Sequence, residues 1–316
     1  MTDEKSRPTD NAVFGPLMGG SPEPTYGGAL SFMRRRYSRD LTDVDAVVWG
    51  IPFDQAVSNR PGARFGPSAI RRASAIFDGD PQYPFGFDPF EPLAVVDYGD
   101  AAFDYTQPQT FADAIEAQAA HVIKGEAQLF SLGGDHFVTW PLLKAHAGRH
   151  GRLALVQFDA HQDTWPDHGG ISHGGFVARA VREGLIDPAR SIQVGIRTIA
   201  PEDCGIAIVP GHALDTLGIP GVIGRIREVV GEMPAYLTFD IDCLDPAFAP
   251  GTGTPVAGGL SSREALAILR GLGPVDFVGG DVVEVAPPYD HSDITAIAGA
   301  TVAMYYLGLL AERRRG

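Results

Sequence analysis

Short apolar runs alternate with longer segments of helical periodicity along most of this 316-residue chain. Eight runs have the length and composition of buried strands: residues 45–51, 93–96, 128–132, 153–158, 192–196, 206–209, 235–239 and 276–282. Apolar residues recur at helical spacing in segments between or after most of them: residues 111–124, 142–147, 175–183, 222–230, 262–269 and 292–313. Strands that alternate with helices predict an α/β fold, with a mostly parallel sheet covered by helices on both faces.

The beginning of the chain differs from the rest. Residues 1–28 are polar and rich in Pro and Gly, which predicts an extended N-terminal arm laid over the surface. Residues 29–316 contain no internal repeat or linker, so we expect one domain there. Four arginines lie within residues 34–39. In an acidic protein such a run is typical of a solvated or subunit-facing segment rather than of a nucleic-acid site.

Composition narrows the classes of partner and compartment. The chain has 39 acidic and 25 basic residues and a formal net charge of −14, which argues against binding of nucleic acid or of an anionic membrane and favours cationic small molecules. The two cysteines are too few for a disulfide framework. We find no apolar run of about 18 residues and no apolar signal-peptide core, so we expect a cytoplasmic protein.

The clearest candidate for chemistry is Asp159-Ala160-His161-Gln162-Asp163, which follows the apolar run 153–158. Open parallel sheets place their chemistry where strands end. In an extended segment, side chains at alternate positions project to the same side, so Asp159, His161 and Asp163 could face one point. This pattern favours a metal site, although polar clusters at strand ends also cap helices and close turns.

A histidine follows another predicted strand, in Ser131-Leu132-Gly133-Gly134-Asp135-His136. The paired glycines lack a Walker lysine and the spacing of a dinucleotide-binding loop, so we interpret them as a sharp turn. A lone histidine is usually structural. We expect the strand before His136 to neighbour the strand before Asp159, which would make His136 a further metal ligand.

Two more carboxylates, Asp240 and Asp242, follow the run 235–239. Two carboxylates on one side repel each other unless a cation or a shared proton lies between them. The neighbouring Cys243 is better interpreted as a small buried apolar residue than as a thiolate ligand. Asp245 precedes Pro246, which is typical of a turn.

Together the strand ends supply four carboxylates and two imidazoles: His136, Asp159, His161, Asp163, Asp240 and Asp242. Six ligands exceed the need of one catalytic ion but suit two ions with bridging carboxylates. Oxygen-rich ligands favour manganese or magnesium over zinc, and the two histidines favour manganese. Such a site would hold a metal-bridging hydroxide as a nucleophile, which predicts a hydrolase. His173 could carry a proton at the pocket rim, and Glu284, at the end of another strand, could pair with a guanidinium.

Several sequence blocks together resemble the ureohydrolases, the family of the arginases and agmatinases. These blocks are Leu132-Gly133-Gly134-Asp135-His136, Asp159-Ala160-His161-Gln162-Asp163, Ser172-His173-Gly174, Phe239-Asp240-Ile241-Asp242-Cys243-Leu244-Asp245-Pro246 and the runs 60–67, 250–255 and 284–290. The resemblance extends over roughly residues 26–312 and is greatest with the agmatinase branch. It implies a three-layer αβα sandwich around an eight-stranded, mostly parallel sheet.

The resemblance also implies two Mn²⁺ ions per subunit. One ion would be held by His136, Asp159, Asp163 and Asp240. The other would be held by Asp159, His161, Asp240 and Asp242, so that Asp159 and Asp240 bridge the two.

In the mechanism that the resemblance implies, a metal-bridging hydroxide attacks the guanidinium carbon. Asp163 would help pass a proton to the departing amine, His173 would assist substrate binding or proton transfer, and Glu284 would hold the guanidinium. The products would be urea and putrescine. The family also suggests a homotrimer or homohexamer.

The exact substrate stays open at this point. Gln162 and Gly175 depart from the usual family pattern near the pocket. The loop 164–172 contains Asp167 and His168 but no Lys or Arg. A substrate with a cationic end, such as agmatine, therefore suits this loop better than a substrate with a carboxylate end, such as guanidinobutyrate. The alternatives are a guanidinobutyrase or another guanidino-acid ureohydrolase, a catalytically silent guanidino-binding or scaffold protein, and a single-zinc deacetylase on a related fold.

Overall fold

The computed structural model describes residues 10–20, 23–77, 80–166 and 169–315. Its centre is a parallel sheet with the strand order β1-β3-β2-β4-β9-β8-β5-β6-β7. The strands are β1 Arg36–Tyr37, β2 Ala46–Gly50, β3 Val95–Asp100, β4 Gln128–Leu132, β5 Ala154–Phe158, β6 Ile192–Ile196, β7 Ala207–Pro210, β8 Ala235–Asp240 and β9 Phe277–Val283. The expected α/β fold with a parallel sheet is confirmed.

Within the described residues the sheet has nine strands, one more than the eight that the resemblance implied. All eight apolar runs form strands. The additional strand, β1, consists of only two residues that pair with β3 at one edge of the sheet. Two residues are too few to produce a recognisable hydrophobic pattern.

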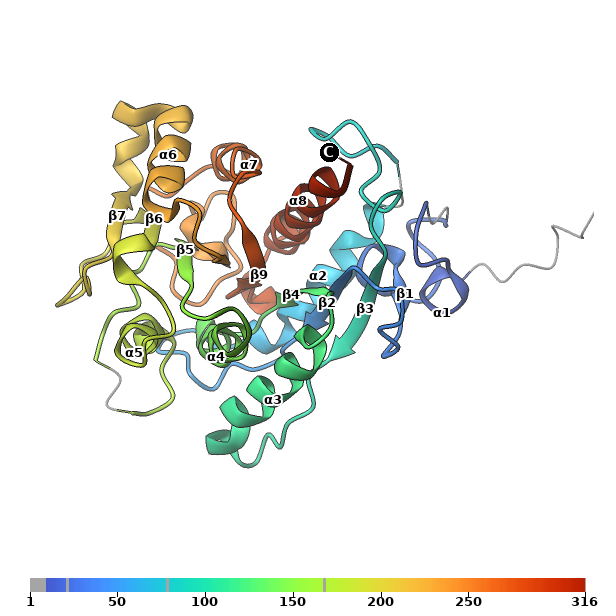
Figure 1. The fold of residues 1–316 in the computed structure, drawn as a ribbon, viewed down its shortest axis with the longest axis horizontal. Coiled ribbons are helices and arrows are strands. Elements are labelled where there is room, and N and C mark those ends of the chain that lie inside the picture. The colour runs from blue at the N-terminus through green and yellow to red at the C-terminus, as the bar shows by residue number, and fades with distance from the viewer. Residues whose placement is uncertain (1–9, 21–22, 78–79, 167–168, 316) are drawn as a thin grey trace, which may run out of the picture.

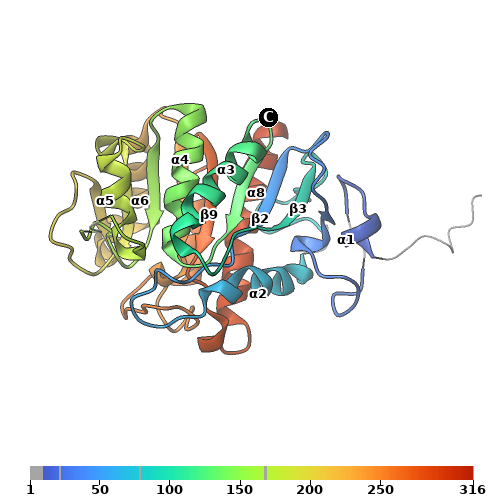
Figure 2. The ribbon, with the colours of Figure 1, turned by 90° about the horizontal axis from the view of Figure 1, so that it is seen from below.

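Helices cover both faces of the sheet and complete three layers (Figures 1 and 2). Helices α3, α4 and α5 lie on one face, and α2, α6, α7 and α8 lie on the other. The α-helices are α1 Asn11–Phe14, α2 Gly66–Ala73, α3 Phe111–Ile123, α4 Thr139–His150, α5 Phe176–Arg182, α6 Leu214–Val230, α7 Ser262–Arg270 and α8 Ile294–Arg315. Single 3₁₀ turns include η6 His136–Val138, η7 His173–Gly175 and η10 Ile241–Cys243.

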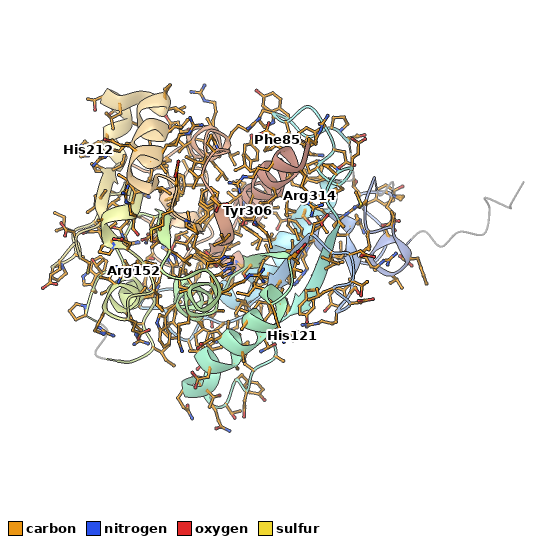
Figure 3. The ribbon with its side chains drawn as sticks, viewed as in Figure 1. Phe85, His121, Arg152, His212, Tyr306 and Arg314 are labelled. Atoms are coloured by element: carbon orange, nitrogen blue, oxygen red, sulfur yellow. The ribbon has the colours of Figure 1, made fainter. Side chains whose placement is uncertain are left out.

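Helix α8 forms the middle of its layer. Tyr306 of this helix is buried in the interior (Figure 3), where its hydroxyl donates to Gln128 Oε1 at 3.1 Å. An 18-residue window of α8 has a mean hydropathy of 1.7, which is apolar enough to cross a membrane, so the expectation that no such run exists is wrong. However, 83% of that window is buried inside the protein, as expected for a helix in a protein core.

Two of the four arginines within residues 34–39 are not solvated as expected, because Arg34 is 1% exposed and Arg35 is fully buried, whereas Arg39 is exposed. Arg34 donates to the carbonyl oxygens of Ala29 and Thr25, each at 3.1 Å, and Arg35 donates to Gly19 O at 2.9 Å. Burial lowers the pKa of Arg35 to about 10. These bonds hold the described part of the N-terminal arm against the domain. Residues 1–9 and 21–22 of the arm, and Asp167 and His168, lie outside the described residues.

The strands that precede the candidate ligands form one contiguous set, β4-β9-β8-β5. Leu132 of β4 pairs with Val282 of β9, and Phe239 of β8 pairs with both Val282 and Phe158 of β5. The four strands therefore end at the same level. The expectation that β4 neighbours β5 is wrong, because β9 and β8 lie between them. The candidate ligands still meet because all four strands are parallel and end together.

Candidate metal centre

Tight turns, rather than an extended chain, bring the ligands together after β5 and β8. Asp163 has a φ of 53°, in the left-handed region that side chains other than glycine seldom adopt. Asp242 lies in the 3₁₀ turn η10. The backbone N–H of His161 donates to Asp159 Oδ1 at 2.6 Å, and that of Asp242 donates to Asp240 Oδ1 at 2.8 Å. Each strand-end carboxylate is thus oriented by the turn that follows it.

The first ligand group surrounds His136. Its Nδ1 lies 3.1 Å from Asp159 Oδ2, 3.0 Å from Asp163 Oδ2 and 3.1 Å from Asp240 Oδ2. All four side chains are buried. This is the set that the resemblance assigned to the first ion.

The second ligand group surrounds His161. Its Nδ1 lies 3.1 Å from Asp242 Oδ2 and 3.4 Å from Asp159 Oδ1. Asp159 therefore offers one carboxylate oxygen to each group, as a bridging ligand must. The geometry places Asp240 in the first group, and its participation in the second stays a prediction.

The hydrogen bonds of His136 fit a metal ligand. Its Nε2 lies 2.8 Å from the hydroxyl of Thr238, and that hydroxyl donates to Asp281 Oδ1 at 2.6 Å. Because the Thr238 proton is committed to Asp281, Nε2 must donate, which leaves a lone pair on Nδ1. This lone pair faces three carboxylates and has no hydrogen-bond partner among the described residues. A cation at the centre of the group would satisfy all four side chains.

The pKa shifts within the cluster also indicate that positive charge is needed between these side chains. Burial, and then the charge of Asp159, raises the pKa of Asp163 to about 6. Burial also raises the pKa of Asp240 and Asp242. Burial lowers the pKa of His161, but Asp159 and Asp242 outweigh it and raise that pKa to about 12. The four carboxylates therefore require cations or protons between them.

A chain of buried amides supports Asp159 from behind. Gln157 Nε2 donates to Asp159 Oδ2 at 2.7 Å, and Gln193 Nε2 donates to Gln157 Oε1 at 2.7 Å. Gln193 also donates to the backbone oxygen of Gln162, whose side-chain oxygen accepts the backbone N–H of Ala200 at 2.6 Å. Gln162, which departs from the family pattern, thus holds the loop after β6 and does not line the candidate cavity.

His173 and Glu284 lie beside the ligands. His173 Nδ1 lies 3.0 Å from Glu284 Oε1, which also accepts the backbone N–H of His136 at 2.9 Å. Glu284 is fully buried and has a φ of 63°, so its backbone, like that of Asp163, is strained at the site. Burial lowers the pKa of His173, but the charges of Glu284, Asp163 and Asp135 raise it to about 9.

A cavity of about 330 Å³ opens onto these groups. Its described lining residues are Ser58, His161, Asp163, Trp165, Ser172, His173, Gly174, Asp240 and Thr254. Glu284 is not among them, and Gly174 rather than Gly175 lines the cavity. The sequence reasoning missed Ser58, Trp165 and Gln157 and took Thr254 only as part of a structural loop. No residue-type pattern distinguishes them from ordinary loop and strand residues.

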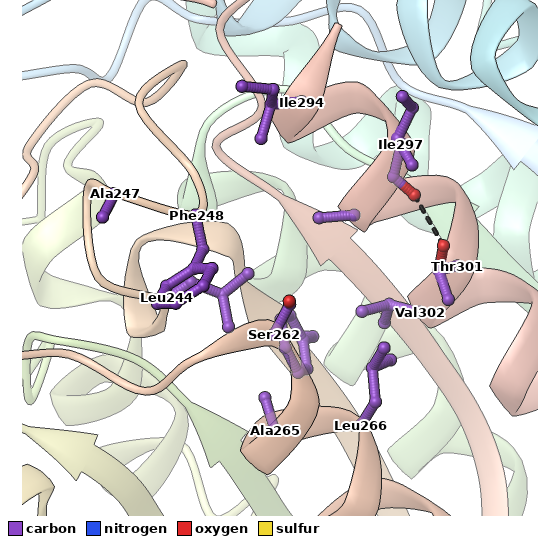
Figure 4. Close-up of a pocket in the computed structure, with 12 residues that line it drawn as sticks. Leu244, Ala247, Phe248, Ser262, Ala265, Leu266, Ile294, Ile297, Thr301 and Val302 are labelled. Atoms are coloured by element: carbon purple, nitrogen blue, oxygen red, sulfur yellow. Dashed lines mark hydrogen bonds between the residues drawn. The ribbon is translucent and has the colours of Figure 1, made fainter.

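A second cavity, of about 290 Å³, lies between the loop after β8 and helices α7 and α8 (Figure 4). Leu244, Phe248 and Ile297 are among its lining residues, and the polar ones are Ser262 and Thr301. The Thr301 hydroxyl donates to the backbone oxygen of Ile297 at 2.8 Å. Neither polar group has the acid–base or metal-binding chemistry of the first cavity, which we take as the candidate active site.

The model of the arginase family matches residues 44–308. This chain belongs to the arginase family. Among curated relatives, the agmatinase of Chromobacterium violaceum is 52% identical over 301 residues, which cover 94% of each chain. The agmatinase of Neisseria meningitidis serogroup C is 50% identical over 271 residues, which cover 85% of this chain and 88% of the relative.

Solved structures of arginase-family members are also similar to this chain. A hypothetical agmatinase from Burkholderia thailandensis is 53% identical, with a TM-score of 0.96 over 97% of this chain and 99% of that one. Proclavaminate amidinohydrolase from Streptomyces clavuligerus is 40% identical, with a TM-score of 0.87 over 92% of this chain and 99% of that one. The arginase-family frame of this chain therefore occurs in relatives that are named for different substrates.

Proposed function

We propose that this chain is an agmatinase, which hydrolyses agmatine to putrescine and urea. The observation that carries the proposal is the 52% identity to an agmatinase over 94% of both chains, combined with an intact set of six candidate ligands. Loss of one or two ligands would be the expected mark of a catalytically silent member. The ligands lie in two groups that share Asp159, which favours a binuclear site over the single-zinc alternative.

The site is suited to two Mn²⁺ ions. His136, Asp159, Asp163 and Asp240 would hold the first, and Asp159, His161, Asp240 and Asp242 the second. The donors are oxygen and imidazole nitrogen, without a thiolate, which suits manganese. When bound, the ions would lower the pKa of a water molecule and so supply a nucleophile at neutral pH.

The remaining side chains supply binding and proton transfer. Asp163 lines the cavity, and we propose that it carries a proton from the attacking water to the departing amine. Glu284 Oε1 contacts His173 Nδ1 and accepts the backbone N–H of His136, but Oε2 has no hydrogen-bond partner among the described residues. We propose that Oε2 pairs with the guanidinium, since a carboxylate and a guanidinium form charge-assisted hydrogen bonds.

The lining of the cavity favours a cationic substrate tail. Its described residues include Asp163 and Asp240 but no Lys or Arg that could bind a carboxylate. Hydrolysis of a guanidino acid, as by a guanidinobutyrase, is the second candidate. It is favoured by the hydroxyls of Ser58, Ser172 and Thr254, which could bind a carboxylate, and by the proclavaminate amidinohydrolase on the same frame.

A substrate panel tests the proposal. Urea release by the manganese-loaded protein is measured with agmatine, arginine, guanidinobutyrate and guanidinopropionate at equal concentrations. We expect kcat/KM to be highest for agmatine. A clear preference for a guanidino acid would overturn the agmatine assignment while leaving the hydrolase assignment in place, and absence of urea from every compound would favour a silent binding protein.

We also propose that the chain assembles as a homotrimer or homohexamer, as its resemblance to the family suggests, and that it lies in the cytoplasm, as its two isolated cysteines suggest. Light scattering on the purified protein measures the mass directly. With a chain mass of 33.6 kDa, a monomeric or dimeric mass at micromolar concentration would contradict the proposal.

A further inference from the structure

Ser58 connects His173 to the open part of the cavity. Its backbone nitrogen lies 3.1 Å and its hydroxyl oxygen 2.8 Å from His173 Nε2. On the other side of the ring, His173 Nδ1 lies 3.0 Å from Glu284 Oε1. Ser58 and His173 both line the cavity, whereas Glu284 is fully buried. A continuous chain of carboxylate, imidazole and hydroxyl therefore runs from the interior to the cavity.

The contacts of His173 suit both of its protonation states. Protonated His173 donates from Nδ1 to Glu284 and from Nε2 to the Ser58 hydroxyl. Neutral His173 has a lone pair on Nε2, which accepts the backbone N–H of Ser58. A ring with partners for both states can lose and regain a proton without moving.

The loop that carries Ser58 is fixed on both sides of the site. Asp135 Oδ2 accepts the backbone N–H of Ala56 at 2.7 Å, and Ala56 O accepts the backbone N–H of His173 at 3.4 Å. Farther along the loop, Asn59 Nδ2 donates to Gly253 O at 2.9 Å. Ser58 is thus held at a fixed distance from the imidazole by contacts that do not involve its own side chain.

We propose that Ser58 relays a proton from His173 to the departing amine of the guanidino substrate. The inference rests on the proposed hydrolysis of agmatine and names a residue that the sequence did not single out. Hydrolysis adds the oxygen of water to the guanidinium carbon, and both hydrogens of that water must finally be balanced by protons on the amine, which leaves as an ammonium ion. Two proton deliveries are therefore needed, and Asp163 accounts for one.

The second delivery is balanced as follows. When the carbon–nitrogen bond breaks, its electron pair goes to the amine nitrogen, which takes the hydroxyl proton of Ser58. The Ser58 oxygen takes the Nε2 proton of His173 at the same time, so the serine is regenerated. His173 is left neutral, with its remaining proton on Nδ1, facing Glu284. The other product, protonated urea, releases one proton to solvent, and solvent returns one proton to His173 Nε2.

The test compares two leaving groups. Agmatine releases a strongly basic alkylamine, whereas its oxyguanidine analogue, with oxygen in place of the methylene next to the guanidino group, releases a weakly basic O-alkylhydroxylamine. For Ser58→Ala we expect kcat on agmatine to fall about 100-fold, the lower range for loss of acid–base catalysis, with KM little changed. On the analogue the fall should be about tenfold or less, because its leaving group depends less on proton donation. Ser58→Thr, which keeps the hydroxyl, should retain most of the activity.

Several outcomes would overturn the relay. An unchanged kcat in Ser58→Ala, an equal fractional loss on both substrates, or a loss in Ser58→Thr as large as in Ser58→Ala would show that Ser58 only positions His173. Ser172→Ala, which removes another hydroxyl of the cavity, is the matched comparison and should affect both substrates by the same factor. The wild-type rate on agmatine tests the proposed function separately. If the wild type prefers a guanidino acid, that acid and its oxyguanidine analogue replace the agmatine pair in the same comparison.

Discussion

The two ligand groups meet in one residue, Asp159, whose two oxygens lie near different imidazoles. Oδ2 is 3.1 Å from His136 Nδ1, and Oδ1 is 3.4 Å from His161 Nδ1. Loss of a residue that belongs to both groups should weaken the retention of both ions, whereas loss of Asp242 should weaken mainly the retention of the second. This difference distinguishes one shared site from two independent sites.

We therefore expect Asp159→Ala to abolish most activity and to weaken retention of both ions. Changes to residues behind a metal ligand typically cost about 10–100-fold, so loss of a bridging ligand should cost more than about 100-fold in kcat/KM. The measurement is metal content after dialysis, together with urea release from agmatine. Asp113→Ala, an exposed carboxylate of α3, is the control and should keep both. Full retention of both ions by the Asp159 variant would contradict the bridge.

Substitution of Gln157 tests whether the buried amides support metal binding or only the stability of the fold. In Gln157→Leu, Asp159 Oδ2 loses its 2.7 Å donor and Gln193 loses one of its two acceptors. An unsatisfied buried polar group costs about 1–3 kcal/mol in the free energy of unfolding. We expect metal affinity to fall about 10–100-fold as well. Denaturant titration and metal titration measure the two effects, and an unchanged metal affinity would show that the amides stabilise only the fold.

Residue identity predicted the six ligand candidates, because four carboxylates and two imidazoles at the ends of several strands suit a metal site better than helix caps or turns. It did not reveal Gln157 or Ser58, because a glutamine in a strand and a serine in a loop are common everywhere. Their roles depend on a few hydrogen bonds between segments that are far apart in sequence, such as the 2.8 Å contact of Ser58 with His173. Residue identity also led to a wrong expectation for Arg34 and Arg35, which are not solvated but buried against the N-terminal arm.

At the scale of elements, Arg197 joins the loops that carry the ligands. It follows β6, and its backbone N–H donates to Ala160 O at 3.0 Å in the loop after β5. Its guanidinium donates to Asp242 O at 2.6 Å, and also to the backbone oxygens of Cys243, Leu244 and Val256. A planar guanidinium can serve several carbonyl groups at once.

We expect Arg197→Lys to loosen the loop after β8, because one ammonium cannot reach all of these carbonyl oxygens. Metal affinity should fall about tenfold or more, chiefly at the group that includes Asp242. Arg225→Lys is the matched control, since Arg225 is about half exposed and pairs with Glu228 at the surface, where substitutions change stability by at most about 0.5 kcal/mol. Equal metal affinity of the two variants would contradict the role of Arg197.

The elements themselves were largely predictable. All eight apolar runs are strands, because buried parallel strands are continuous apolar segments. Strand order was not predictable, and β9 and β8 lie between β4 and β5. Local periodicity says which face of a strand is buried but nothing about its neighbours. Likewise, Asp163 and Asp242 converge through a left-handed residue and a 3₁₀ turn, which the alternating pattern did not indicate.

At the scale of the whole molecule, stability should depend on pH through His146 of α4. Its ring is fully buried against Gly279 of β9, and neither ring nitrogen has a hydrogen-bond partner among the described residues. Burial lowers its pKa from 6.5 to about 3. Between these values the unfolded chain binds a proton that the folded chain does not.

The free energy of unfolding should therefore fall as pH decreases from 6.5 to about 3, by about 1.4 kcal/mol per pH unit from this one group. His146→Leu should remove that contribution, so the difference in stability between wild type and variant should change with pH in this window. His121→Gln, at an exposed position of α3, is the control. A pH-independent difference for His146→Leu would contradict the assignment.

We propose that six ligands at the ends of β4, β5 and β8 form one two-ion centre for the hydrolysis of agmatine. The most direct test is to add Mn²⁺ stepwise to metal-free protein and measure urea release from agmatine at each step. We predict that the rate rises until two equivalents per chain are bound and then stays constant. A full rate at one equivalent, or no urea at any ratio, would contradict the account.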